Sequence, residues 1–381
     1  MTSYRIPFNK PSLTGKELSY ITDAIIRGHS AGDGFYTDRC HRLLEAMLGS
    51  PRTLLTTSCT HALEMAALLL NIAPGDEVIV PSFTFVSTAN AFALRGARIV
   101  FGDVRADTLN LNESLLPSLI TERTRAIVPV HYAGVGCKMS SILDVAAARG
   151  CTVIEDNAHG LFSKYEGKHL GTFGALATQS FHETKNVTCG EGGALIINDP
   201  GLVDRAEIIR EKGTNRSRFF RGQVDKYTWV DLGSSYLPSD ILAAFLLAQL
   251  EAYELILTRR RRIWDLYDKG LREWALQSGV RQPFVPHDCE QSYHMYYLIM
   301  PSLEVRQRLI NFMKRQGILT VFHYVPLHLS DMGIKFGGRK GQCPVTESIS
   351  DCLIRLPFYN DLTEIDQCEV IENILRFEEW I

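Results

Sequence analysis

The sequence predicts an α/β protein with a mostly parallel sheet in a larger N-terminal domain and a smaller α/β domain at the C-terminus. Between residues 53 and 200, short β-branched or apolar runs alternate with helical stretches, which is typical of a parallel sheet covered on both faces. The chain has 381 residues, more than a single hydrophobic core usually serves. We therefore expect two domains, residues 1–254 and 255–381.

The first 50 residues predict an extended start and two helices, at 15–27 and 37–48, with Thr37 as the N-cap of the second helix. Between these helices, Gly32-Asp33-Gly34 predicts a tight turn. The turn either lies at the edge of a ligand site, which makes Asp33 a candidate contact, or simply joins two helices.

Seven β-branched or apolar runs are expected to form strands of the large domain, at residues 53–56, 77–80, 98–101, 126–130, 152–154, 178–181 and 194–197. Helical stretches separate most of them, at residues 61–70, 88–94 and 141–149. No G-x-G-x-x-G motif follows the first strand, so a dinucleotide-binding fold of the Rossmann type is disfavoured.

Residues 205–231 are polar, basic and aromatic, and a stretch of this length and composition predicts a functional loop. One long amphipathic helix, residues 239–266, is expected to lead into the smaller domain. That domain is predicted to contain two strands and two helices, at residues 296–300, 320–322, 303–316 and 363–378.

The charge balance of 40 Lys+Arg against 43 Asp+Glu gives no overall attraction to nucleic acid or to an anionic membrane. An anionic ligand must therefore meet a local cluster of donors. The nine cysteines are scattered and form no C-x-x-C pair, so neither a metal site nor a disulfide framework is expected. Scattered thiols, a start without a signal region and the lack of an apolar run of ~18 residues predict a cytoplasmic protein.

Lys185 lies between two apolar strands, just after residues 175–181 and before the glycine-rich turn Gly190–Gly193. Ligand sites of α/β folds gather at strand ends, and a lysine there can form a Schiff base with pyridoxal phosphate (PLP). A single lysine in a loop is more often merely solvated. Support must come from the other groups that PLP needs: an acid at the pyridine nitrogen, an anion cradle for the phosphate and a flat group over the ring.

Each of these groups has a candidate. Asp156 follows strand 152–154 and either faces the cofactor or caps a helix. The run Thr56–Glu64 places hydroxyl groups at a helix N-terminus, where free N–H groups and the helix dipole bind phosphate. Phe85 follows a strand and is either a stacking residue or part of the core.

At several points the chain resembles the DegT/DnrJ/StrS sugar-nucleotide aminotransferases, which are PLP enzymes of the aspartate-aminotransferase fold (fold type I). The resemblance keeps one order along nearly the whole chain. The matching segments are Ser58-Cys59-Thr60 with Ala62-Leu63, Pro81-Ser82-Phe83-Thr84-Phe85, Val130-His131-Tyr132-Ala133-Gly134, Glu155-Asp156, Ser180-Phe181-His182 with Lys185-Asn186, Gly190-Glu191-Gly192-Gly193, and His323-Tyr324 with Pro326 and His328.

This resemblance implies that Lys185 is the catalytic residue, which holds PLP as a Schiff base and moves a proton. Because some relatives carry His there and are dehydratases, Lys185 favours transamination. The other implied cofactor contacts are Asp156 at the pyridinium, Phe85 over the ring, His159 near the ring hydroxyl, and Thr60, His61 and Ser180 at the phosphate. Many members place an Asn against the phosphate of the partner subunit, but this chain reads Gly233-Ser234-Ser235-Tyr236-Leu237, and we assign Ser235 to that contact.

Further segments, above all 210–217 and 219–229, resemble members that aminate a dTDP-linked 4-keto sugar in enterobacterial common antigen synthesis. They imply transfer of the amino group of L-glutamate to dTDP-4-keto-6-deoxy-D-glucose, giving dTDP-4-amino-4,6-dideoxy-D-galactose, in a homodimer with shared active sites. The candidate substrate contacts are Asp33, His182, Glu183, Arg210, Arg216, Arg218, His323 and Tyr324. Amination to the 4-amino-glucose epimer or of a 3-keto sugar remains an alternative, as does a PLP-binding regulator without turnover.

Overall fold

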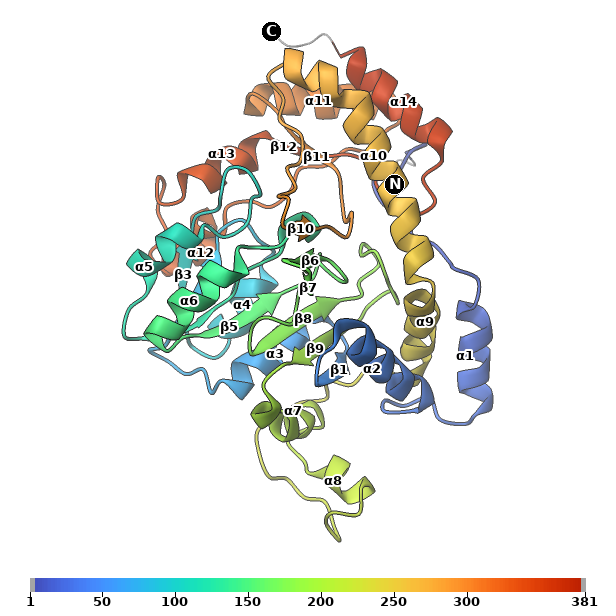
Figure 1. Cartoon of the computed structure of the whole chain (residues 1–381), viewed down its shortest axis with the longest axis vertical. Helices are drawn as coiled ribbons and strands as arrows, with labels where there is room; N and C mark the ends of the chain where they lie inside the picture. Colours follow the sequence, from blue (N-terminus) through green and yellow to red (C-terminus); the bar gives the residue numbers. More distant parts are fainter. Residues whose placement is uncertain (1–3, 378–381) are drawn as a thin grey trace.

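The computed structural model describes residues 4–377, and its centre is a seven-stranded sheet in the order β1-β9-β8-β5-β4-β2-β3 (Figure 1). The strands are β1 (Arg52–Thr56), β2 (Glu77–Pro81), β3 (Arg98–Gly102), β4 (Thr124–Ile127), β5 (Thr152–Asp156), β8 (Leu176–Ser180) and β9 (Gly193–Ile197). All of them run parallel except β9, which is antiparallel to both of its neighbours. The predicted mostly parallel sheet is confirmed, with strand ends shifted by one to three residues.

Helices cover both faces of this sheet because its strands are apolar on both sides. In β9, Leu195 and Ile197 belong to the core under one set of helices, whereas Ala194 and Ile196 belong to the core on the opposite face. The first face carries α3 (Cys59–Leu69), α4 (Ser87–Ala93) and α7 (Val203–Arg210); the second carries α2 (Phe35–Leu48), α6 (Met139–Arg149) and α9 (Asp240–Glu251). Continuous burial of this kind is typical of strands in parallel sheets.

The C-terminal region packs around a core of its own. Its elements are α10 (Tyr253–Gln277), β11 (Tyr297–Ile299), α11 (Leu303–Arg315), α12 (Asp331–Lys335), α13 (Pro344–Cys352), β12 (Leu353–Arg355) and α14 (Glu364–Leu375). Of these, α10, β11, α11, β12 and α14 share this core, whereas Ile349 of α13 packs with Phe83 and Tyr132. Ile6 joins this core and bridges to Ile318, so the start of the chain packs with its end. The predicted division into domains of residues 1–254 and 255–381 stays a prediction. Ile6 does not fit this division, because it packs in the C-terminal core.

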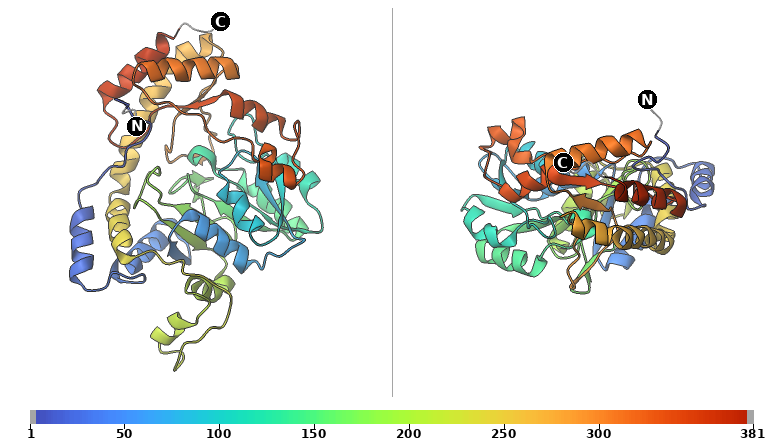
Figure 2. Two further views of the ribbon diagram at one scale, coloured as in Figure 1. Left: turned by 180° about the vertical axis from the view of Figure 1, so that it is seen from behind. Right: turned by 90° about the horizontal axis from the view of Figure 1, so that it is seen from above.

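Smaller elements complete the fold. They are α1 (Glu17–Ile26), α5 (Leu116–Leu119), α8 (Arg216–Phe220), and a three-stranded sheet of β10 (Cys289–Glu290), β6 (Lys164–Tyr165) and β7 (Lys168–His169). The views agree that α8 protrudes from the body beyond α7 (Figures 1 and 2). All nine cysteines are free.

Two predicted helices differ from the structure. The predicted helix 239–266 is two helices, α9 and α10, which meet at a bend of 63°. No single described helix is long and apolar enough to cross a membrane; α9 and α10 together satisfy that length and composition only across their bend. The predicted helix 363–378 has Thr363 as its N-cap and ends at Leu375, and Glu378 lies outside the described residues.

The predicted strand at 320–322 was wrong, because only Val321 forms a bridge, with Arg355. The partner of β11 is instead β12, in antiparallel register. A strand of three residues has too short an apolar pattern to be recognised in a sequence.

Thr37 is not the N-cap that the sequence predicts, because α2 begins two residues earlier, after Gly34. The free backbone N–H groups at the N-terminus of α2 are bound by Asp240, a residue remote in the sequence that is 1% exposed. Its carboxylate accepts hydrogen bonds from the backbone N–H groups of Tyr36 (3.2 Å) and Thr37 (2.8 Å) and from the Thr37 hydroxyl (2.8 Å). Asp240 thereby joins α2 to α9.

Replacing this buried carboxylate tests its contribution to stability. We expect Asp240→Ala to lower the free energy of unfolding by about 2–4 kcal/mol, because three donors lose their acceptor. Asp38→Ala is the matched control, since Asp38 forms an exposed ion pair with Arg42 and such pairs contribute about 0–1 kcal/mol. Urea denaturation followed by circular dichroism measures both variants, and equal effects would contradict the assigned role of Asp240.

Candidate active site

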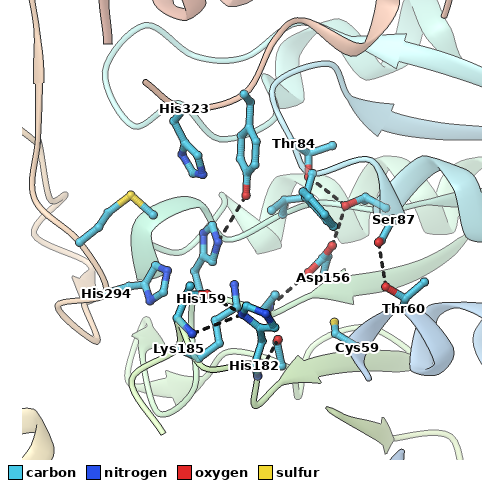
Figure 3. Close-up of a pocket in the computed structure, with 18 of the residues that line it drawn as sticks. Cys59, Thr60, Thr84, Ser87, Asp156, His159, His182, Lys185, His294 and His323 are labelled. Carbon is cyan, nitrogen blue, oxygen red and sulfur yellow. Dashed lines mark hydrogen bonds between the residues drawn. The ribbon is translucent and has the colours of Figure 1, made fainter. Parts of the chain in front are cut away.

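A cavity of about 750 Å³ opens at the carboxyl ends of β2, β5 and β8, where the sheet meets the C-terminal region (Figure 3). Parallel strands place their carboxyl ends at one edge of a sheet, so side chains that follow different strands converge there. The structure brings to this cavity the predicted residues Thr60, Phe85, Asp156, His159, Ser180, His182, Lys185, His323 and Tyr324.

Lys185 follows β8 in a turn in which its backbone N–H donates to the carbonyl of His182 (2.9 Å). Among the residues that the structure describes, none accepts a hydrogen bond from its side-chain nitrogen. Burial lowers the pKa of Lys185 to about 8, although the charges of Cys59 and Asp156 oppose this shift. A neutral amine is the nucleophilic form, and at this pKa about a tenth of Lys185 is neutral at pH 7, far more than for an ordinary lysine.

Asp156 is the last residue of β5 and is 5% exposed. Its carboxylate accepts hydrogen bonds from the Thr88 hydroxyl (2.7 Å) and from the backbone N–H of Ala158 (3.2 Å), and Thr88 bonds in turn to the hydroxyl of Thr84 (2.9 Å). Burial raises the pKa of Asp156, while these hydrogen bonds and Lys185 counteract it. A carboxylate fixed in this way is suited to a cationic ring nitrogen.

The N-terminus of α3 forms another side of the cavity. Ser58 caps the helix by accepting from the backbone N–H of His61 (3.1 Å), and the Thr60 hydroxyl bonds to Ser87 (2.8 Å). Within the described residues, the backbone N–H groups of Cys59 and Thr60 have no acceptor. Gly193 is required behind them, since a Cβ there would overlap the backbone of Ser58 and Cys59. Two free N–H groups at a helix N-terminus suit a phosphate.

Stacked aromatic rings form the wall contributed by the C-terminal region. His159 stacks on His294 with ring centroids 4.3 Å apart, and His323 stacks on Tyr324 at 3.6 Å. Burial lowers the pKa of all three histidines well below the ordinary value, so they are neutral at pH 7. Their Nδ1 atoms have fixed partners in the backbone N–H of Ala133, the side chain of Asn186 and the hydroxyl of Tyr132, respectively.

His294 and Arg355 line the cavity but were missing from the prediction. Neither residue follows a strand of the large sheet, and neither belongs to a motif that the sequence displays. His294 is held because the buried Arg260 donates hydrogen bonds to the carbonyls of Tyr293 and His294. Phe85 was predicted to be either a stacking residue or part of the core. It lines the cavity and is 57% exposed, so its ring is not part of the core.

Other predicted residues lie outside this cavity. His61 bonds to the Thr57 hydroxyl and packs on Tyr236. Ser235 pairs with Glu211. The exposed Glu183 donates its backbone N–H to the carbonyl of Gly190 and accepts from Asn9 at its own backbone carbonyl. Their predicted roles stay predictions.

The predicted basic residues are paired with acids. Arg210, 4% exposed, donates to Asp33 (2.7 Å) and to the carbonyl of Leu55 (2.7 Å), which ties α7 to the N-terminal turn. Residues 214–229, which the bridge between Thr214 and Trp229 closes, form the protruding segment around α8. There Arg216 lies 3.4 Å from Glu211 and Arg218 lies 2.7 Å from Asp204. None of these four predicted contacts, Asp33, Arg210, Arg216 and Arg218, lines the cavity of its own chain, and their roles in substrate binding stay predictions.

Comparison with known proteins identifies relatives over nearly the whole chain. The profile of the DegT/DnrJ/EryC1/StrS aminotransferase family matches residues 11–375. The GDP-perosamine synthase of Escherichia coli O157:H7 is 32% identical over 373 residues, covering 98% of each chain. The spore coat polysaccharide biosynthesis protein SpsC of Bacillus subtilis is 30% identical, covering 97% of this chain and 96% of its own.

Among solved structures, Spr1654 from Streptococcus pneumoniae matches in its pyridoxamine phosphate form with a TM-score of 0.90 and 28% identity, covering 97% of this chain and 98% of that one. Its PLP form matches with a TM-score of 0.88 and 29% identity, covering 97% of both chains. The cavity fits this cofactor. Lys185 is available for the aldehyde, Asp156 for the pyridine nitrogen and the free N–H groups of α3 for the phosphate.

The lowered pKa of Lys185 predicts how capture of PLP by the cofactor-free protein depends on pH. The rate of covalent capture should rise through a midpoint near pH 8, because the neutral amine reacts and an ordinary lysine would need a pH near 10.5. Absorbance after mixing with PLP at a series of pH values gives this midpoint. Lys185→Ala should abolish capture, as read by borohydride reduction and mass spectrometry, and the exposed Lys168→Ala should leave it unchanged; a midpoint near 10.5 would contradict the burial argument.

Proposed function

The chain belongs to the DegT/DnrJ/EryC1/StrS aminotransferase family, and from this premise we propose that it transfers the amino group of L-glutamate to dTDP-4-keto-6-deoxy-D-glucose. The product is dTDP-4-amino-4,6-dideoxy-D-galactose. The observation that carries transamination is the half-buried Lys185, whose amine has a lowered pKa, in one cavity with Asp156. The choice of sugar is supported by the resemblance of segments 210–217 and 219–229 to members that act on this substrate.

When bound, PLP supplies an electron sink that stabilises negative charge at a carbon next to the transferred nitrogen. The residues of this chain supply the rest. Asp156 holds positive charge at the pyridine nitrogen, and Thr88 keeps the carboxylate in place. Lys185 Nζ takes the proton from the α-carbon of the amino donor and later delivers one to C4 of the sugar. An amine with a pKa of about 8 performs both transfers near neutral pH.

The histidine wall suits a sugar. The rings of His294 and His323 are neutral and line the cavity. Their Nδ1 atoms are bonded to Asn186 and Tyr132, so each ring has its Nε2 atom left for a sugar hydroxyl. Sugar hydroxyls need such partners and no charge. Among the described lining residues, the lysine and arginine side chains are those of Lys185, whose charge is partly lost near neutral pH, and Arg355.

The nucleotide diphosphate requires more cations than the cavity offers. We place it against Arg216 and Arg218 of a second copy of the chain, in a homodimer with shared active sites. The protruding segment supports this arrangement, since Phe220 is 70% exposed and Trp229 is 75% exposed, and large exposed aromatic groups mark interaction surfaces. Ser235 bridges to Glu211 at the base of this segment, and we assign to it the contact with the cofactor phosphate of the partner.

A GDP-linked keto sugar is the second candidate substrate, because GDP-perosamine synthase is among the relatives at 32% identity. The 4-amino-glucose epimer and a 3-amino sugar use the same residues and differ in how the sugar lies on the histidine wall. A PLP-binding regulator without turnover would keep the cofactor contacts but would show no half-reaction with glutamate.

Analysis of the product tests the proposed reaction. After incubation with L-glutamate and dTDP-4-keto-6-deoxy-D-glucose, proton NMR should show an axial 4-amino group, with a small H3–H4 coupling constant. A large coupling constant would mean the glucose epimer, and no product would favour the regulator. The GDP-linked keto sugar should react with a kcat/KM at least roughly 10-fold lower. Lys185→Ala should give no turnover with either nucleotide.

Oligomeric state tests the shared site. The native chain should run as a dimer in light scattering, and Trp229→Ser should shift it toward the monomer and raise the KM for the nucleotide sugar on dilution, because a buried Trp contributes much of an interface. Leu276→Ser is the control, since Leu276 is 84% exposed on α10, away from this segment. A native monomer with full activity would overturn the shared site.

A further inference from the structure

Ser82, His328 and Glu347 form a hydrogen-bonded chain, here called the clasp, that ties the C-terminal region to the end of β2. His328 Nε2 lies 3.0 Å from Glu347 Oε1, which also accepts from the backbone N–H of Gly341 (2.7 Å). The carboxylate keeps a hydrogen on Nε2, so Nδ1 accepts from the Ser82 hydroxyl (2.6 Å). Ser82 in turn accepts from the backbone N–H groups of His328, at its hydroxyl (3.2 Å), and of Leu327, at its carbonyl (2.9 Å).

A serine, a histidine and a carboxylate joined in this order also make up hydrolytic triads. In the clasp, however, Ser82 and His328 are fully buried, and neither of them lines the cavity. A substrate cannot reach the Ser82 hydroxyl, so this serine cannot serve as a nucleophile. The clasp holds two segments of the chain together.

The segment that the clasp holds is closely packed on its other side as well. A Cβ on Gly333 would overlap the carbonyl oxygen of Leu327, and a Cβ on Gly338 would overlap that of His328. The two glycines let α12 and the loop after it press against the backbone of these residues. His328 therefore lies between the sheet and α12 with little room to shift.

The backbone of Tyr324, four residues before His328, has a positive φ of 28°. A bulky residue rarely adopts a positive φ, and such a conformation persists only where neighbouring contacts hold it. Before the clasp, the Ser350 hydroxyl donates to the Tyr324 carbonyl (2.9 Å). In this conformation the Tyr324 ring stacks on His323 with centroids 3.6 Å apart, and its hydroxyl lies 3.5 Å from His159 Nε2.

The clasp fixes both sides of the contact between β2 and this aromatic pair. Phe83 follows Ser82, and its ring meets the Tyr324 ring edge-on, with centroids 5.5 Å apart. Its centroid lies 6.2 Å from that of His323. A shift of His328 relative to Ser82 would therefore move Tyr324 and His323 against Phe83, and with them two groups that line the cavity.

We propose that the clasp positions His323 and Tyr324 for the sugar half of the reaction. Its three members are positioning residues, which act through these two rings. This inference rests on the proposed function, in that His323 and Tyr324 contact the sugar. The half-reaction with the amino donor depends on Lys185 and Asp156, and neither side chain bonds to a member of the clasp.

Variants of Glu347 test the clasp from outside the cavity. Glu347→Ala removes the acceptor of His328 Nε2, whereas Glu347→Gln keeps an oxygen there. Stopped-flow absorbance of the cofactor gives kcat/KM for the amine-loaded enzyme with the nucleotide sugar and for the PLP-loaded enzyme with L-glutamate. Glu347→Ala should lower the value for the sugar about 10-fold and leave that for glutamate unchanged. Glu347→Gln should restore most of the value for the sugar, and Ser82→Ala should behave like Glu347→Ala.

A variant in the same region controls for a general loss of stability. Gln367 is fully buried and donates to the carbonyl of Ile263, which joins α14 to α10 away from the cavity. Gln367→Leu should lower the Tm without changing the ratio of the two kcat/KM values. An equal loss with both substrates in Glu347→Ala, or no loss with either, would overturn the proposal. The same change of ratio in Gln367→Leu would also overturn it.

Amide hydrogen exchange of the PLP-loaded enzyme tests the clasp without turnover. In Glu347→Ala, the peptide that contains Leu327 and His328 should exchange about 10-fold faster than in the native enzyme. Glu347→Gln should restore its protection, and Gln367→Leu should leave this peptide unchanged. If the native amine-loaded enzyme does not react with the sugar, the proposed function has failed, and exchange alone decides whether the clasp holds this segment. Unchanged exchange in Glu347→Ala would overturn the clasp itself.

Discussion

The active-site edge of the sheet depends on a buried carboxylate that does not face the cavity. Glu155 is fully buried, and it accepts hydrogen bonds from the backbone N–H groups of Gly171 (2.7 Å), Phe173 (2.7 Å) and Gly174 (2.8 Å) and from His131 Nε2 (2.9 Å). These donors offset the cost of burying the charge. Because neighbouring residues of a strand point to opposite faces, anchoring Glu155 on one side fixes Asp156 on the other.

A second network joins the lysine turn to the C-terminal region. Asn186 follows Lys185, donates to the carbonyl of Ser292 (2.7 Å) and bonds through its oxygen to His294 (2.8 Å). Asn360 donates to the backbone carbonyl of Asn186 (3.4 Å) and accepts from Arg260 (2.7 Å). The reactive amine is therefore placed by contacts with the C-terminal region as well as by the sheet, and the cavity is complete only when that region is docked.

The sequence predicts the sheet and the residues at its strand ends well, because both follow from local patterns. Asp156 and Lys185 each lie within a few residues of the end of an apolar run, and parallel strands bring such positions together. Arg355 and His294 were not predicted. The pairing of β11 with β12 places Arg355, and hydrogen bonds from Arg260 place His294. Neither interaction leaves a periodic pattern in the sequence. The N-cap of α2 was predicted wrongly for the same reason, because Asp240 is far from the first turn of α2 in the sequence. The ion pairs of Arg216 with Glu211 and of Arg218 with Asp204 form only in the folded chain, so the sequence did not predict them either.

The neutral histidines have a consequence for the order of events in the cavity. An aminotransferase receives two unlike molecules in turn, an amino acid and a sugar. An ammonium or carboxylate group in the wall would favour one of them, whereas the uncharged rings supply both kinds of partner. Because the Nδ1 atom of His159 accepts from Ala133, its Nε2 carries a hydrogen and can donate, and because the Nδ1 atom of His294 donates to Asn186, its Nε2 can accept. The rings of His159, His294 and His323 thus let one surface contact two successive substrates of different polarity. Discrimination between the two substrates is left to charged side chains at a few fixed positions.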